Sequence, residues 1–215
     1  MTTEELIRKL KFYDYIFFDL DNTIYDEFKY INKIIKLNYY YFYFSKFILF
    51  KKFQLKFPYI YKKYGNNKLI NKIYSIFKIN NFYLNNDIKY AKIMKSKVKI
   101  KCFNWFLMHL KNCENISKNY VITNGKKWRQ LEKLKLLNLS KFINRKNLVF
   151  ANKFPKPSVK SLKNFKKNYS SKVLMIGDDN VDKIFSKRMN FDFCKINFKR
   201  NKKGFIDQRT IYFSC

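Results

Sequence analysis

Short apolar runs recur along the chain, and each of them ends at polar residues. The runs are YIFF (15–18), YVIT (120–123), LVFA (148–151), VLMIG (173–177) and, as a fifth candidate, FDFCKINF (191–198). Continuous apolar runs of this length are typical of parallel strands that are buried on both faces. The pattern therefore predicts a parallel sheet.

Segments with helical periodicity alternate with these runs. They lie at 126–139, 158–168 and 180–190, and Asn190 can take the left-handed conformation in which a helix often ends. Strands that alternate with helices favour right-handed crossovers and an open sheet covered on both faces. The expected fold class is α/β, a three-layer Rossmann-like parallel sheet.

The interval between the first two runs breaks this alternation. It contains helix-length segments of aromatic and aliphatic residues at 28–48, 51–64, 67–78 and 103–113. We interpret the first three as an inserted all-α domain and the fourth as the helix that returns to the sheet. The predicted core domain comprises residues 1–26 and 101–215, and the predicted helical insertion comprises residues 27–100.

Charge is the most unusual feature of the composition. The chain has 47 Lys and Arg against 15 Asp and Glu, a formal net charge of +32, which is typical of partners such as nucleic acid or an anionic membrane. However, 41 of the 47 are Lys, and the chain has 24 Phe and 17 Tyr but only 4 Gly. These residues have AT-rich codons, and the lysines are spread along the chain. We therefore favour an AT-rich genome as the cause and keep nucleic-acid binding as the alternative.

The chain carries no pattern of a secreted or membrane protein. Its four cysteines form no CxxC pair and its only histidine is His109, which argues against a disulfide framework or a structural zinc site and favours a reducing cytosol. The most apolar stretch, 37–53, is interrupted by Lys46 and Lys51, and it falls short of the roughly 20 apolar residues of a spanning helix. The N-terminus has no signal-peptide pattern. We expect a cytoplasmic protein without a membrane partner, and the oligomeric state stays open.

Reactive side chains follow four of the five runs, where ligands of open parallel sheets bind. They are Asp19 and Asp21 after the first run, Thr123 and Asn124 at the end of the second, Lys156 after the third, and Asp178, Asp179 and Asp182 after the fourth. One carboxylate can attack phosphorus, and a second can transfer the proton. Carboxylates so close together favour Mg²⁺ between them, and a hydroxyl and an ammonium can hold phosphoryl oxygens.

The stretches DLDNT, ITNG, KP and GDDNVD, in this order, resemble the four motifs of the haloacid dehalogenase superfamily. The resemblance implies that Asp19 is the nucleophile and Asp21 the acid/base. It also implies that the phosphate is bound by Thr123, Asn124 and Lys156. The stretch TNGKKWRQLEKLKLLNLSKF is similar to a second pattern of the same family, with Gln130, Lys133, Leu134 and Leu137 in place.

The resemblance also implies a Mg²⁺ cofactor. Its ligands would be Asp19, Asp178 and the backbone carbonyl of Asp21. Asp182 matches the second acid of the fourth motif, and Asp179 is its neighbour, so both are expected beside the metal ligands rather than among them.

The second acid of the first motif bears on the reaction. Dehalogenases of the family lack it because halide leaves without a proton, so Asp21 favours phosphate esters. An insertion between the first two motifs is where the family places its helical, C1-type cap. The expected activity is a phosphatase that acts on a small phosphorylated metabolite, a nucleotide or sugar phosphate, through an aspartyl-phosphate, as in pyrimidine 5′-nucleotidases and phosphoglycolate phosphatases. The alternatives are a phosphotransferase of the β-phosphoglucomutase kind and a non-catalytic, basic nucleic-acid-binding protein on the same scaffold.

Overall fold

The computed structural model describes residues 1–42, 47–64, 72, 75–76, 98–113, 118–163, 165, 170–201 and 204–215. The chain divides into two compact units. The first comprises Met1–Glu27, Ile100–Arg200 and Ile206–Cys215, and the second comprises Phe28–Lys99 and Asn201–Phe205. The short segment Asn201–Phe205, which the sequence analysis grouped with the core, clusters with the second unit.

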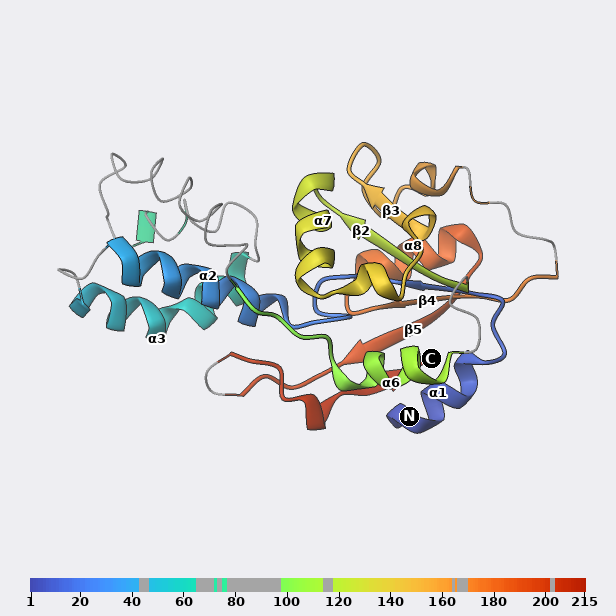
Figure 1. Cartoon of the computed structure of the whole chain (residues 1–215), viewed down its shortest axis with the longest axis horizontal. Coiled ribbons are helices and arrows are strands. Elements are labelled where there is room, and N and C mark those ends of the chain that lie inside the picture. The colour runs from blue at the N-terminus through green and yellow to red at the C-terminus, as the bar shows by residue number, and fades with distance from the viewer. Residues whose placement is uncertain are drawn as a thin grey trace. The chain divides into compact units, whose positions relative to one another are not determined.

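The first unit is built on a six-stranded sheet with the order β3-β2-β1-β4-β5-β6 (Figure 1). The strands are β1 Tyr15–Phe18, β2 Asn119–Asn124, β3 Leu148–Ala151, β4 Val173–Gly177, β5 Asp192–Asn197 and β6 Tyr212–Ser214. The first five are parallel, and β6 runs antiparallel to β5 at the edge. The five apolar runs thus form the five parallel strands, and the predicted α/β fold class is confirmed.

Helices cover both faces of this sheet. They are α1 Thr3–Leu10, α6 Asn104–Asn112, α7 Lys127–Leu136 and α8 Asn180–Met189, with the 3₁₀ turns η4 Leu139–Lys141, η5 Arg145–Asn147, η6 Val159–Leu162 and η7 Gln208–Thr210. Neighbouring side chains of a strand point to opposite faces. Accordingly Phe17 packs in a core cluster with Phe185 of α8, whereas Phe18 packs against Phe106 of α6 at a ring distance of 5.1 Å. This gives the three layers.

The helix predicted at 158–168 is only partly present. Val159–Leu162 form the 3₁₀ turn η6, and residues 164 and 166–169 lie outside the described part of the chain. Leu162 is nevertheless buried in the same core cluster as Phe17, so the short turn still covers the sheet.

In the second unit the structure describes two long helices, α2 Glu27–Phe42 and α3 Phe47–Tyr64. Phe28 of α2 stacks on Phe57 of α3 at 4.9 Å and meets the edge of Tyr61 at 5.0 Å. Gly204 packs closely against the same ring. A Cβ at this position, where φ is +81°, would lie 2.7 Å from Phe28. Most of the predicted segment 67–78 lies outside the described residues. None of the described helices is both long and apolar enough to cross a membrane.

One covalent link was not foreseen from the sequence. Cys194 of β5 and Cys215 at the chain end form a disulfide with a Cα–Cα distance of 4.0 Å. The antiparallel pairing of Lys195 with Ser214 brings the two cysteines together although they are 21 positions apart. The cysteine pattern argues against a disulfide framework, and this bridge leaves no signal in it because the apolar runs do not predict β6.

Candidate functional site

A cavity of about 200 Å³ opens at the carboxyl ends of the central strands. It is lined by Asp19, Asp21, Asn22, Glu27, Thr123, Asn124, Lys156, Asp178, Asp179, Val181 and Asp182. All eight residues that the sequence analysis singled out lie on this wall, although they come from four separate segments. The parallel sheet explains the gathering, because the carboxyl ends of its strands meet at one edge.

The loop after β1 fixes the first two acids. Asp19 is buried, and its backbone N–H donates to the Ile176 carbonyl at 2.9 Å, which ties the end of β1 to β4. The loop turns back at Asn22, which has a φ of +59°. Asn tolerates this left-handed conformation better than most residues. Asp21 then pairs with Tyr25 across the turn, and its carboxylate faces the cavity.

Lys156 is a buried lysine that bridges two acids. Its Nζ lies 2.5 Å from Oδ1 of Asp19 and 2.5 Å from Oδ1 of Asp182. Burial by itself lowers the pKa of this lysine, but the attraction of the two carboxylates outweighs it, so the pKa is raised and the side chain is an ammonium.

Asn124 holds the backbone that carries Lys156. The Lys156 N–H donates to Oδ1 of Asn124 at 2.8 Å, and Nδ2 of Asn124 donates to the Lys156 carbonyl at 3.4 Å. The peptide bond between Lys156 and Pro157 is cis. Thr123, one residue earlier, is 2% exposed, and its hydroxyl donates to the Asn124 carbonyl at 3.3 Å. The side chain of Asn124 thus positions the lysine, and a direct phosphate contact of Asn124 stays a prediction.

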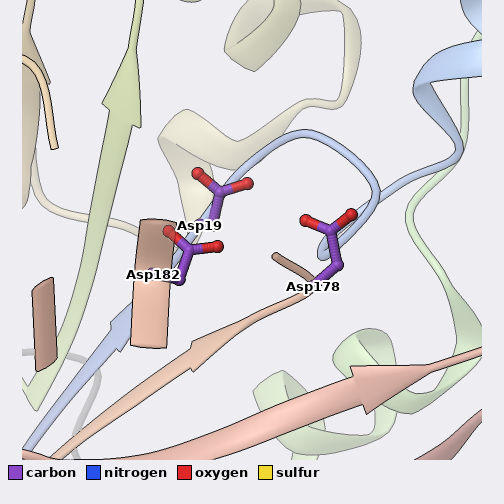
Figure 2. Close-up of side chains that lie close together, drawn as sticks. All are labelled: Asp19, Asp178 and Asp182. Carbon is purple, nitrogen blue, oxygen red and sulfur yellow. The ribbon is translucent and has the colours of Figure 1, made fainter. Parts of the chain in front are cut away.

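Three carboxylates, which we call the acid cluster, point into the same space (Figure 2). The acid cluster comprises Asp19, Asp178 and Asp182, which can each offer one oxygen within 4.8 Å of the others. Burial, followed by repulsion from Asp182 and Asp21, raises the pKa of Asp19 to about 7 even though Lys156 opposes the shift. Burial, followed by repulsion from Asp19 and Asp182, raises the pKa of Asp178, and burial, followed by repulsion from Asp179, raises the pKa of Asp182 although Lys156 opposes the shift.

These shifts describe a site that is short of positive charge. Lys156 balances only part of the negative charge of the acid cluster, and carboxylates crowded in this way bind protons unless further positive charge lies beside them. Their oxygen-only donor set suits a hard divalent ion. The acid cluster can therefore hold a metal ion, and Asp182 belongs to the cluster itself rather than to its surroundings.

The start of α8 explains the spacing between Asp179 and Asp182 in the fourth motif. Asp179 is the N-cap residue, and its carboxylate accepts the backbone N–H of Asp182 at 3.0 Å. The first turn of the helix then carries Asp182 back over the end of β4. A Cβ at Gly177 would lie 2.2 Å from Oδ2 of Asp182, so glycine is required there. Asp179 is exposed and caps the helix, whereas Asp182 is 2% exposed.

The structure adds residues that the sequence analysis did not assign to the site. Lys133 of α7 is buried, and its Nζ lies 2.7 Å from both carboxylate oxygens of Asp21 and 3.4 Å from Oε1 of Glu27. The Tyr25 hydroxyl donates to Oδ1 of Asp21. One signal was available, since Lys133 falls on the same helical face as Leu134 and Leu137, both buried. A lysine on an apolar face needs a buried partner.

The chain is similar to known proteins in sequence and in fold. The family model described as haloacid dehalogenase-like hydrolase matches residues 16–196. The putative HAD-hydrolase YfnB of Bacillus subtilis, in a structure described as bound to magnesium, matches with a TM-score of 0.61 and 17% identity over 91% of this chain and 92% of that one. A putative beta-phosphoglucomutase of Thermotoga maritima matches with a TM-score of 0.56 and 18% identity over 83% of this chain and 82% of that one.

A hydrolase of Streptococcus pneumoniae has a TM-score of 0.58 and 15% identity over 85% of this chain and 91% of that one. At these identities the structural matches establish the fold alone. A comparison with curated protein sequences found no significant match.

Proposed function

The chain belongs to the haloacid dehalogenase-like hydrolase family, and from this premise we propose that it is a Mg²⁺-dependent phosphatase of small phosphomonoesters. The observation that carries the proposal is the pair of carboxylates, Asp19 and Asp21, on the wall of one cavity. Asp19 alone would serve a reaction whose leaving group departs as an anion. A second carboxylate beside the nucleophile serves a leaving oxygen that needs a proton.

The proposed reaction has two steps. In the first, a carboxylate oxygen of Asp19 bonds to phosphorus while the ester P–O bond breaks, and Asp21 gives its proton to the departing oxygen. In the second, the oxygen of a water molecule bonds to phosphorus and Asp21 takes a proton from it. The bond between Asp19 and phosphorus then breaks, and inorganic phosphate leaves.

The remaining residues hold the phosphoryl group and its charge. Lys156 and Thr123 lie where an ammonium and a hydroxyl can bind phosphoryl oxygens. Asp19, Asp178 and the Asp21 carbonyl are the proposed metal ligands, and Asp182 is close enough to join them. When bound, Mg²⁺ would offset the negative charge that the carboxylates and the phosphoryl group bring together. The magnesium in the YfnB structure supports this choice of ion.

The substrate class follows from the family rather than from cavity contacts. We propose a nucleotide or sugar phosphate, with the helical insertion as the cap over it, as in pyrimidine 5′-nucleotidases and phosphoglycolate phosphatases. The similarity to a putative beta-phosphoglucomutase supports a second candidate, in which the phosphoryl group of Asp19 passes to a sugar hydroxyl instead of water. Release of inorganic phosphate from a simple ester separates the two, because a mutase returns the group to its substrate.

The decisive experiment compares the wild-type protein with Asp19→Asn on 4-nitrophenyl phosphate, with and without Mg²⁺. We expect Mg²⁺-dependent release of phosphate from the wild type and none from the variant, which keeps the size of the side chain but lacks the nucleophile. A panel of nucleotides and sugar phosphates then identifies the ester. No release on any ester from folded, Mg²⁺-loaded protein would overturn the phosphatase proposal and favour a binding role for the basic surface.

A further inference from the structure

Each of the two proposed catalytic carboxylates has a buried lysine of its own. Lys156 bridges Asp19 and Asp182, and Lys133 bridges Asp21 and Glu27. The side chain of Lys133 is 8% exposed, that of Glu27 10% and that of Asp21 24%, so Asp21 is the most exposed member of this group, and it lines the cavity.

Lys133 is held in this position by its contacts with Asp21 at 2.7 Å and Glu27 at 3.4 Å. Moving this ammonium away would remove a charged partner from both carboxylates, which is unfavourable at a buried site. The ion pair with Lys133 therefore holds the Asp21 side chain in place.

The contacts also orient the carboxylate of Asp21. An ionised carboxylate has about four acceptor positions. Lys133 occupies one on each oxygen, and the Tyr25 hydroxyl occupies a second one on Oδ1. Among the described residues one position remains, on Oδ2, so one oxygen atom is presented for the reacting proton.

We propose that Lys133 is a positioning residue for the proton transfer by Asp21, with Glu27 holding the lysine in place. This inference rests on the proposed phosphatase function. Proton transfer requires the acid within hydrogen-bond distance of the leaving oxygen, and a side chain that rotates freely meets this condition only part of the time. Lys133 itself neither gives nor takes a proton in the reaction.

The test uses two esters that differ in their need for a proton. 4-Nitrophenyl phosphate releases a stable phenolate, whereas 4-nitrobenzyl phosphate has the same ring but releases an alkoxide that must be protonated. For Lys133→Met we expect kcat/KM for the benzyl ester to fall about 10²-fold more than for the phenyl ester. The same selective loss is expected for Asp21→Asn, and KM should change little.

Three further variants control for a structural effect. Lys133→Arg keeps a cation with several donors, and it should restore much of the benzyl-ester activity. Glu27→Gln, which leaves the pair with Asp21 intact, should show a smaller loss that is again selective for the benzyl ester. Lys135→Met changes an exposed lysine of the same helix and should leave both activities unchanged. If Lys133→Met does not fold, the Arg and Gln variants carry the test.

The outcomes are distinguishable. A loss that is equal on both esters, or no loss, would overturn the positioning role and leave the phosphatase function standing. A wild-type protein that hydrolyses neither ester would overturn the proposed function, and the role of Lys133 with it.

Discussion

Individual side chains in the cavity are held by opposite charges rather than by solvent. The proposed nucleophile Asp19 and the proposed acid/base Asp21 lie on the same short loop, yet they are bound to different lysines. The two carboxylates can therefore act in different ways although they are only two positions apart. Lys156 links Asp19 to Asp182 within the acid cluster, whereas Lys133 links Asp21 to α7.

This separation predicts how Asp21→Asn behaves. The Asp21 carboxylate is not part of the acid cluster, and its proposed metal contact is the backbone carbonyl, so Mg²⁺ affinity should stay within a few-fold of wild type. Turnover should fall about 10²- to 10⁴-fold, the usual contribution of a general acid. Steady-state kinetics measure the turnover, and a Mg²⁺ titration followed by thermal unfolding measures the Mg²⁺ affinity. Full turnover in this variant would remove the acid/base assignment.

At the scale of an element, two acids at the start of α8 have different functions. Asp179 caps the helix and Asp182 joins the acid cluster. For Asp179→Ala we expect a loss of about 1 kcal/mol of stability, the usual cost of removing an N-cap, with Mg²⁺ affinity and turnover nearly unchanged. Urea unfolding and kinetics measure the two effects. Asp179→Asn is the matched control, because Asn caps as well as Asp, and a large loss of Mg²⁺ affinity in it would make Asp179 a ligand.

The strands could be predicted because each buried parallel strand leaves a complete apolar run in the sequence. The strand β6 could not, since Tyr212–Ser214 is three residues long and only Phe213 is buried. Its place in the sheet depends on pairing with β5, which is a contact between segments and leaves no local pattern. The disulfide of Cys194 could not be predicted for the same reason.

The site was predictable to the extent that it lies at strand ends. Asp19, Thr123, Lys156 and Asp178 come at or shortly after a run, and the sheet brings them to one edge. Lys133 comes from the middle of a helix, and its place on the apolar face with Leu134 and Leu137 indicates burial but does not identify its partner. Its partner across 112 positions is fixed only by how α7 packs.

For the whole molecule, the distribution of acids is more informative than the net charge. An AT-rich base composition would account for many lysines, but it would not explain why six of the 15 acids line one cavity. The acids are Asp19, Asp21, Glu27, Asp178, Asp179 and Asp182. Concentrating them costs stability unless positive charge balances them, and Lys133, Lys156 and a metal ion in the acid cluster can supply that charge. The surrounding positive charge in turn favours the approach of an anionic substrate.

The cost of the acid cluster predicts how stability depends on pH and metal. Without a cation, the pKa of Asp19 is about 7 and those of Asp178 and Asp182 are also raised above the ordinary 3.8. Because the folded state then binds more protons than the unfolded one between about pH 4 and pH 7, this cluster makes the metal-free protein less stable as pH rises through that range.

Mg²⁺ should reverse this trend, because it binds the ionised cluster and competes with its protons. At a fixed Mg²⁺ concentration, the increase in Tm should be small at about pH 6 and larger at about pH 8. Thermal unfolding with and without Mg²⁺ measures this without any substrate, so it stands apart from the question of activity. Asp178→Asn should lose most of the increase, whereas Asp207→Asn, which changes an acid far along the chain from the cluster, should keep it. An increase that is independent of pH, or equal in both variants, would mean that the metal binds elsewhere.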